Sequence, residues 1–440
     1  MWAVLAQDFA NGVFYRPLLS DAGYGGTRYF PLSFVLHGLL MRAGLPIAAS
    51  GHLVSVGALA ALASGVYALS RRSGVERRLA MGVAGLVVLT LPFQIALTRI
   101  AGDALPAALN VWALVLCLPV ESAKPKQLAG ATVLFVLAFA AKMTTVFGAA
   151  AAVIALWLQG RRRASVAVAG ASALGFALVL ATIHGASAGR FLESVRIINQ
   201  ESGWSLGRGL KLFFARLQTD LPIYLLVLGT LVFGPRSRWR ELPMLAFVTT
   251  TLATMVIFTS PGTDTNHLID ICAVSVTALG IFLQRAQVRS WLAAGVVGLG
   301  GTAALSLLGA LGFSYFGTST DQRPVSQALL GKVGPGPKPL LAQSAWLPLL
   351  ASEPVVLMDP WNFILAAQVR PELRRHLFEQ LRTHAFRAVV LDQALGEYVG
   401  TPDDAHPKDA LGPGFNDALT GSYVHSAEVD SRHVWIPRTQ

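Results

Sequence analysis

The stretch KPKQLAGATVLFVLAFAAKMTTVFGAAAAVIALWLQGRRR, residues 124–163, decides the fold class. It contains two apolar runs, 127–140 and 143–159, which are separated by the charged residue Lys142. Lysines precede the first run and three arginines follow the second, a pattern typical of membrane helices with basic cytoplasmic ends. Both runs are shorter than the roughly 20 residues of a perpendicular span. We therefore predict a hairpin that is buried by protein or crosses only part of the membrane.

The composition of the whole chain supports a membrane protein. Of the 440 residues, 13% are charged and 53% are hydrophobic, whereas soluble domains have about 25% charged residues. These values exclude a cytosolic enzyme and a disordered chain. The net charge is +11, but the basic residues lie in short clusters between apolar runs, which indicates membrane topology rather than nucleic-acid binding. The two cysteines, Cys117 and Cys272, lie in apolar runs and do not form a disulfide framework.

Ten apolar runs are expected to form transmembrane helices. They cover residues 47–70, 79–97, 103–120, 127–140, 143–159, 164–184, 219–234, 241–259, 266–284 and 291–312. Basic residues gather in every second connection, beginning with 71–78, and the positive-inside rule places those connections in the cytoplasm. Residues 1–46 and 313–440 are then extracytoplasmic.

The sequence thus predicts an all-α polytopic membrane protein of about 10 helices with a small extracytoplasmic α/β domain. We expect a first outer loop over 1–46, a transmembrane domain over 47–312 and the soluble domain over 313–440. Within the first loop, residues 31–43 predict an interfacial helix. In the soluble domain, 354–359 and 388–392 predict strands and 371–384 predicts an amphipathic helix. An outer N-terminus also leads us to expect that a spanning helix precedes Met1 in the native protein.

Charged residues near the outer ends of the spans are candidates for function, because an ionisable group at membrane depth is costly. Asp103 begins the third span, where it is either a helix-start acid or a catalytic group. Lys142, between the two short runs, is either a lysine that reaches to the interface or a phosphate contact. Asn266, His267 and Asp270 open the ninth span, just after Asp264, as a polar loop and cap, a substrate or phosphate contact, or a weak metal site.

The first outer loop supplies further candidates. Asp8 and Asp21 are carboxylates that suit proton transfer from an attacking hydroxyl, and Arg28 suits substrate binding. The long outer loop 185–218 is basic and amphipathic, so it forms either a solvated surface helix or a lid over a lipid phosphate.

Several of these segments carry a family resemblance. They are LAQDFANGVFYRPLLSDAGYGGTRYFPLSFVLHGLLMRAGLP (residues 5–46), RIAGDALPAALNVWALVL (99–116), FAAKMTTVFG (139–148) and NHLIDICAVSVTALG (266–280). In order and topology they resemble the GT-C superfamily of polytopic glycosyltransferases, which use polyprenyl-phosphate sugars. Relatives include the protein O-mannosyltransferases and the aminoarabinose lipid A transferases.

The resemblance implies roles for particular residues. Asp103 would lie at the active site, near the acceptor or as a ligand of an optional divalent metal ion. Lys142 would contact the donor phosphate, and His267, with Asn266, would lie at the donor end of the cavity. The family's catalytic base would fall at or before Met1, unless Asp8 or Asp21 takes its place.

The expected function is therefore inverting transfer of a sugar from a polyprenyl-phosphate donor to a hydroxyl at the extracytoplasmic face of the plasma membrane. The acceptor is a lipid, a glycan or a protein, and nucleic acid is not an expected partner. Two alternatives stay open at this point: a transporter or flippase, and an inactive membrane scaffold that binds a partner.

Overall fold

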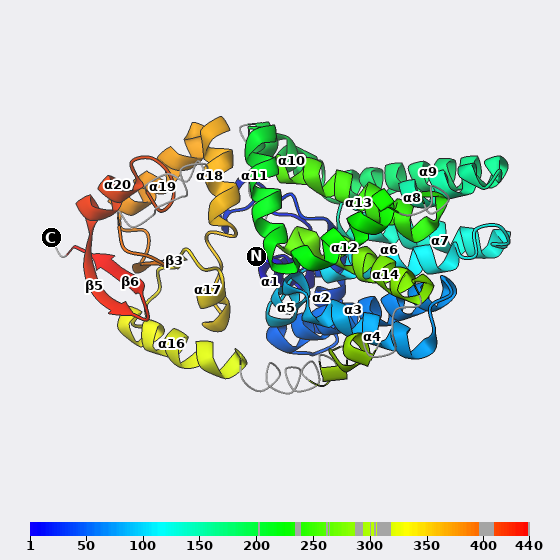
Figure 1. The fold of residues 1–440 in the computed structure, drawn as a ribbon. Coiled ribbons are helices and arrows are strands. Elements are labelled where there is room, and N and C mark those ends of the chain that lie inside the picture. Colours follow the sequence, from blue (N-terminus) through cyan, green and yellow to red (C-terminus); the bar gives the residue numbers. More distant parts are fainter. Residues whose placement is uncertain are drawn as a thin grey trace.

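The computed structural model describes residues 1–200, 203–233, 239–260, 263, 265–286, 294–299, 301–302, 305, 318–395 and 409–438. Figure 1 shows a large helical body beside a smaller α/β part, with the N-terminal segment between them. The chain is mostly helical, in agreement with the expected polytopic class.

The N-terminal segment contains two helices and a short hairpin. They are α1 (Trp2–Ala10), β1 (Leu19–Ser20), β2 (Gly23–Tyr24) and α2 (Pro31–Arg42). Pro31 starts α2 at a position that needs no backbone donor, and Gly44, with φ +96°, follows its end. The helix predicted over 31–43 is therefore confirmed. Gly38 of α2 lets α1 approach closely, because a Cβ there would lie 2.7 Å from a ring carbon of Phe9.

The helical body follows this segment in the chain. Its helices are α3 (Ile47–Arg72), α4 (Arg77–Leu89), α5 (Leu91–Thr98), α6 (Ala104–Leu116), α7 (Pro125–Ala141), α8 (Phe147–Leu158), α9 (Arg162–Ala186), α10 (Arg190–Gln200), α11 (Leu206–Leu217), η1 (Gln218–Asp220), α12 (Leu221–Phe233), α13 (Leu242–Phe258), η3 (Thr265–Leu268) and α14 (Ile269–Arg285). The long loop 185–218 contains the predicted amphipathic helices as α10 and α11. Most of the predicted run 291–312 lies outside the described residues, and so does Asp264.

Three helices of the described chain are long and apolar enough to cross a membrane: Ile47–Arg72, Arg162–Ala186 and Thr265–Arg285. Helices α6, α7, α8 and α13 are apolar but shorter, and α4 and α5 together form one bent candidate span, so helix length within the described residues does not confirm the count of ten. The two short helices α7 and α8, joined at Lys142, match the predicted short hairpin.

The second predicted run, 79–97, is not one straight helix. It breaks into α4 and α5, which are bent by 63°. Thr90 is extended at the break, and Pro92 lies in the first turn of the new helix. Proline lacks an N–H and its ring clashes with the carbonyl four residues earlier, so one helix cannot run straight through Pro92, a break that hydropathy alone does not reveal.

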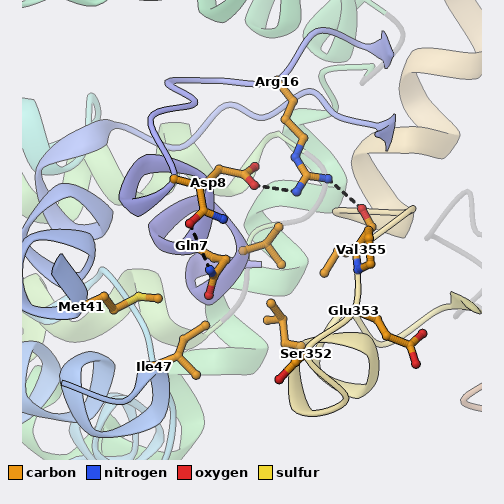
Figure 2. Close-up of a pocket in the computed structure, with 12 residues that line it drawn as sticks. Gln7, Asp8, Arg16, Met41, Ile47, Ser352, Glu353 and Val355 are labelled. Atoms are coloured by element: carbon orange, nitrogen blue, oxygen red, sulfur yellow. Dashed lines mark hydrogen bonds and ion pairs between the residues drawn. The ribbon is translucent and has the colours of Figure 1, made fainter. Parts of the chain in front are cut away.

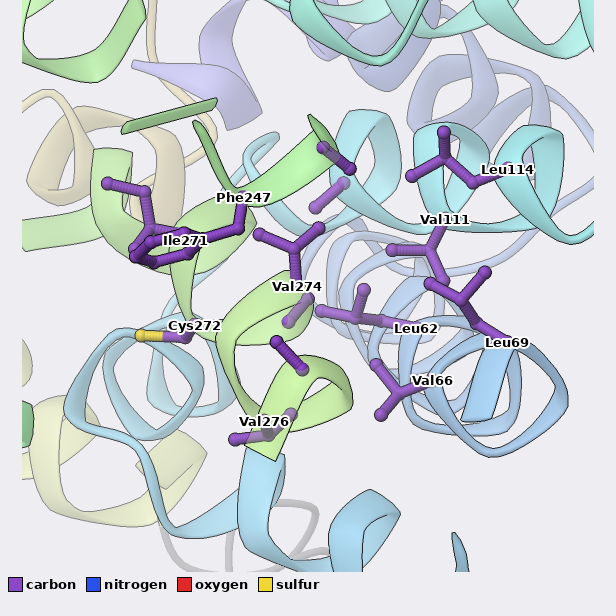
Figure 3. Close-up of a cluster of buried hydrophobic side chains, with 14 of the residues drawn as sticks. Leu62, Val66, Leu69, Val111, Leu114, Phe247, Ile271, Cys272, Val274 and Val276 are labelled. Carbon is purple, nitrogen blue, oxygen red and sulfur yellow. The ribbon is translucent and has the colours of Figure 1, made fainter. Parts of the chain in front are cut away.

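The core of the helical body is aliphatic and closely packed. Figure 3 shows Leu62, Val66 and Leu69 of α3 near Val111 of α6, with Val274 of α14 close by. Because lipid tails are as apolar as these side chains, close packing rather than exclusion of water holds such helices together, and small residues permit it.

The α/β part contains a four-stranded sheet of order β3-β4-β6-β5. Its elements are α16 (Thr318–Val333), β3 (Leu340–Ala342), α17 (Trp346–Leu350), α18 (Pro360–Val369), α19 (Pro371–Arg382), β4 (Ala388–Leu391), α20 (Phe415–Ser422), β5 (Tyr423–Val429) and β6 (Arg432–Pro437). Strands β3 and β4 are parallel, and the other neighbours are antiparallel. The predicted helix over 371–384 and the strand over 388–392 are confirmed; α19 buries Leu373, Leu377 and Leu381.

The strand predicted over 354–359 is wrong. These residues form no strand of the sheet; only Leu357 makes an isolated bridge, to Tyr24 of the N-terminal hairpin. The segment is apolar because Val355 to Met358 are buried between the sheet domain and the N-terminal segment, not because they pair within the sheet.

Tyr24 joins the N-terminal segment to the α/β part. Its backbone N–H donates to the Val356 carbonyl at 2.7 Å, and its own carbonyl accepts from Met358 N–H at 3.2 Å. Its hydroxyl lies 2.7 Å from His376 Nδ1 and donates to Gln380 Oε1 at 2.9 Å, both on α19. The side chain is 1% exposed, so these polar contacts are shielded from water.

Candidate functional site

A buried ion pair joins two parts of the helical body. Lys142 Nζ donates to Asp103 Oδ1 at 2.6 Å, and the two side chains are 16% and 11% exposed. Asp103 immediately precedes α6, where the positive end of the helix dipole favours a carboxylate. Lys142 follows α7 in an extended conformation, at the turn into α8. Asp103 and Lys142, both of which the sequence analysis singled out, are thus in direct contact.

The segment before α14 completes this cluster. Asn266 Nδ2 donates to Asp103 Oδ2 at 2.8 Å, so both oxygens of the carboxylate accept hydrogen bonds. His267, also in η3, is close enough to Asp103 to interact with it electrostatically. Asp270 is buried in the first turn of α14, within electrostatic range of Asp103 and Lys142. We call Asp103, Lys142, Asn266, His267 and Asp270 the polar cluster.

The turn that carries Lys142 is held by a residue that the sequence analysis did not single out. Asn110 Nδ2, in the middle of α6, donates to the Thr145 carbonyl at 3.2 Å. The Thr145 hydroxyl in turn donates to the Lys142 carbonyl at 2.7 Å. Gly148 leaves room for Asn110, because a Cβ at Gly148 would lie 2.5 Å from Asn110 Oδ1. The signal in the sequence was a lone amide inside an apolar run, which is costly unless it has a partner.

Arg28 is within electrostatic range of Tyr29 and of Asp359, the residue that precedes α18. Tyr29 is within electrostatic range of Arg28, Asp103 and Asp359, so it lies between the polar cluster and the start of α18. Asp359 caps α18 by accepting hydrogen bonds from the backbone N–H groups of Trp361 and Asn362. Burial raises the pKa of Asp359, and this rise is opposed by the N-terminal ammonium group, by the hydrogen bonds from Asn362 and Trp361 and, least, by Arg28.

Asp8 and Asp21 lie elsewhere. Asp8 Oδ1 accepts a hydrogen bond from Arg16 at 2.5 Å, and Arg16 also donates to the Val355 carbonyl at 2.7 Å (Figure 2). Burial raises the pKa of Asp8, an effect that Arg16 partly offsets. Asp21 is exposed in the turn between β1 and β2. The structure therefore brings together Asp103, Lys142, Asn266 and His267. It places Asp8 and Asp21 outside this group.

The residues of the polar cluster do not fit a divalent metal ion. Both oxygens of Asp103 accept hydrogen bonds from Lys142 and Asn266, and an ammonium group repels a cation. In the described ranges, no three His, Cys, Asp or Glu side chains are grouped as metal ligands. The metal role of Asp103 therefore rests on the family resemblance alone, and the proposed reaction does not use a metal ion.

Comparison with solved structures covers almost the whole chain. ArnT from Cupriavidus metallidurans in the apo state matches with a TM-score of 0.64 and 14% sequence identity, over 99% of this chain and 92% of ArnT. The same protein bound to undecaprenyl phosphate matches with a TM-score of 0.60 and 13% identity, with the same coverage. The chain has the fold of ArnT.

This similarity confirms the sequence-based resemblance at the level of the fold, because ArnT is an aminoarabinose lipid A transferase of the GT-C type. It also shows that this chain has a membrane-protein architecture. No protein-family model matches the sequence, and comparison with curated proteins gives no significant match. Sequence identity to ArnT is low, so the chemistry has to be argued from the residues themselves.

Proposed function

We propose that this protein is a GT-C glycosyltransferase that moves a sugar from a polyprenyl-phosphate donor to an acceptor hydroxyl at the extracytoplasmic face of the plasma membrane. The observation that carries the proposal is the Lys142 ammonium group, held by Asp103 within a body of apolar helices. The ArnT fold and the undecaprenyl phosphate bound to ArnT support a lipid-phosphate ligand for a cluster of this kind.

The polar cluster suits the binding of a phosphate on a lipid. A lysine provides a compact positive charge with three donors, and only one donor is needed for Asp103. Its other N–H groups remain to bind a phosphate oxygen, while Asp103 fixes the position of the ammonium group. Because Asn266 holds the second oxygen of Asp103, the carboxylate stays oriented when a ligand arrives.

The proposed reaction is an inverting displacement. The acceptor oxygen attacks the anomeric carbon of the sugar, and the bond from that carbon to the phosphate oxygen breaks. The lipid phosphate leaves with the electron pair, and Lys142 stabilises its negative charge. The acceptor's proton passes to a carboxylate. Asp8 and Asp21 are the candidates from the first outer loop, and we add Asp270 because it lies within electrostatic range of Lys142 and Asp103.

Titration with undecaprenyl phosphate tests the ligand. Purified protein in nanodiscs is titrated while binding is followed by native mass spectrometry. We expect Lys142→Ala to weaken binding by about tenfold or more, since a hydrogen bond to a charged group contributes about 1.5–3 kcal/mol. Lys126→Ala is the matched control, because Lys126 is exposed at the opposite end of the same helix. Equal affinities for wild type and Lys142→Ala would reject the proposed phosphate contact.

Transfer of a radiolabelled sugar from a polyprenyl-phosphate donor to membrane acceptors tests the reaction. The variants Asp8→Asn, Asp21→Asn and Asp270→Asn identify the proton acceptor, because its loss lowers kcat while donor affinity is retained. The transporter alternative predicts the opposite behaviour: labelled solute accumulates in vesicles and no sugar is transferred.

A further inference from the structure

A groove of about 550 Å³ lies between α7 and α9, at the end where both helices begin. Figure 1 shows the two helices in the part of the helical body that lies farthest from the α/β part. Farther along they are in close contact, because a Cβ at Gly175 of α9 would lie 2.3 Å from Val136 Cγ2 of α7. Beyond that point the rings of Phe139 and Phe176 stack, with centroids 4.5 Å apart. The groove therefore ends where the helices meet, and its other end lies at their first turns.

The walls of the groove are apolar. Each helix contributes one face, with residues spaced three and four apart. These residues include Leu128, Ala129 and Thr132 on α7 and Ala164, Ala167 and Ala171 on α9. The Thr132 hydroxyl donates to the Leu128 carbonyl at 2.9 Å, so its hydrogen atom is already bonded within its own helix. Walls of this kind fit a hydrocarbon chain.

The length of the groove fits one leaflet of a bilayer. Along α9 the lining extends from Arg161 to Ala171, which is about 15 Å at a rise of 1.5 Å per residue. The hydrocarbon core of a membrane is about 30 Å thick, so the groove covers about half of it. An acyl chain of a lipid in that leaflet would lie along the groove with its headgroup at the first turns.

Two arginines lie at this end of the groove. Arg161 and Arg163 both line it, and Arg163 is exposed. The guanidinium of Arg161 is held in place because it donates to the carbonyls of Val120 at 2.6 Å and Ala123 at 2.8 Å. A carbonyl carries no net charge, so these bonds fix the position of Arg161 without neutralising it. A phosphate would supply the missing negative charge.

The surroundings of these arginines are also basic. The bonds of Arg161 bring the connection before α7 beside the connection before α9. These connections and the first turns that follow them add Lys124, Lys126 and Arg162, whereas Glu121 is the one acid in residues 117–126 and 159–163. The positive-inside rule predicts that this end is cytoplasmic. Basic pockets between membrane helices on that side suit anionic lipid headgroups.

We propose that the groove between α7 and α9 binds an anionic phospholipid of the adjacent leaflet, with one acyl chain between the helices and the phosphate at Arg161 and Arg163. A free phosphate would leave the apolar walls uncovered, and an apolar helix of another protein would leave the arginines without an anion. The site lies at the opposite end of α7 from Lys142, so it is separate from the proposed donor site.

Competition between two lipids with identical chains tests the headgroup. Delipidated protein in detergent is mixed with equal amounts of dioleoyl phosphatidylglycerol and dioleoyl phosphatidylcholine, and bound lipid is identified by native mass spectrometry. We expect phosphatidylglycerol to bind first. Arg163→Gln should lower the ratio of bound phosphatidylglycerol to phosphatidylcholine about fivefold, the factor expected for one basic residue near an anionic headgroup. Arg78→Gln is the matched control, because Arg78 is exposed and is the second residue of α4, as Arg163 is of α9.

A variant that fills the groove tests the acyl chain. Ala167→Trp places a large side chain between α7 and α9 and should abolish the tightest binding step of phosphatidylglycerol. Val166→Trp is the matched control, because Val166 is the preceding residue of α9, is 62% exposed and lies outside the groove lining. This control should bind phosphatidylglycerol as wild type does.

The proposal is overturned if wild type and Arg163→Gln show the same lipid ratio, which would mean that the headgroup is not recognised there. It is also overturned if Ala167→Trp binds phosphatidylglycerol as well as Val166→Trp does, which would leave the groove to an occupant other than lipid. The assay contains no sugar donor and measures no transfer, so its outcome is independent of the proposed glycosyltransferase activity.

Discussion

Lys142 donates a hydrogen bond of 2.6 Å to Asp103 across 39 positions of the chain, and this pair connects the α7–α8 turn to the start of α6. Neither side chain is more than 16% exposed. Removing one member of such a pair leaves the other charge buried and uncompensated, which is more damaging than removing both.

A double-mutant cycle therefore has a predictable sign. Lys142→Met should lower the free energy of unfolding by about 3–5 kcal/mol, because the Asp103 carboxylate loses its counter-charge. The double variant Lys142→Met/Asp103→Asn should be more stable than Lys142→Met alone. Thermal unfolding in detergent, followed by tryptophan fluorescence, provides the comparison. Strictly additive losses would mean that the two residues do not interact in the folded protein.

The support beneath Lys142 gives a second prediction. Gly148→Ala places a methyl group 2.5 Å from Asn110 Oδ1, so Asn110 has to move and the turn at Thr145 moves with it. We expect affinity for undecaprenyl phosphate to fall, with a packing cost of about 1–3 kcal/mol. Gly170→Ala on α9 is the matched control, because a Cβ there meets no atom within 4 Å. If both variants bind alike, the Asn110 contact does not position Lys142.

The contact of Tyr24 with α19 predicts a link between the N-terminal segment and the α/β part. Tyr24→Phe removes the hydroxyl that contacts His376 and Gln380. The expected loss is about 1–2 kcal/mol of stability, with faster proteolysis of residues 1–30. Tyr67→Phe on α3 serves as control, since it lies outside this contact. An unchanged proteolysis rate in Tyr24→Phe would show that the backbone bridge alone is sufficient.

Asp8 predicts a pH dependence of stability. Burial raises the pKa of Asp8 above its ordinary value of 3.8, so the folded protein binds more protons than the unfolded chain between the two values. The contribution of protonated Asp8 to the free energy of unfolding is fully present below pH 3.8, and it is lost as the pH rises through the raised pKa. The Tm of wild type relative to Asp8→Asn should therefore fall as the pH rises from 3.8 toward neutrality. The exposed Asp417 on α20 provides the control: the plot of Tm against pH for Asp417→Asn should run parallel to that of wild type. If the plot for Asp8→Asn also runs parallel to wild type, the raised pKa of Asp8 is contradicted.

Much of this structure could be predicted from hydropathy and charge. Asp103, Lys142 and His267 were candidates because charge is costly at membrane depth, and the same cost makes them meet in the folded protein. Hydropathy does not encode contacts between distant segments, however. The bend at Thr90 depends on the backbone effect of Pro92, and Leu357 pairs with Tyr24 of the N-terminal segment rather than with a strand of the sheet. The β5–β6 hairpin was also missed, although Asp430 and Ser431, both with positive φ, form the kind of turn that joins such strands.

The pairing of Tyr24 with residues of the α/β part bears on how the protein is made. Tyr24 and His376 are 352 positions apart, so the ribosome synthesises the hairpin long before its partners exist. Until the C-terminal part of the polypeptide has emerged, the aromatic ring that becomes one of the least exposed in the molecule has no burial site. The N-terminal segment of a newly made chain would then be open to proteolysis until the C-terminal part is complete. A chain shortened near its C-terminus would leave this segment exposed to quality-control proteases.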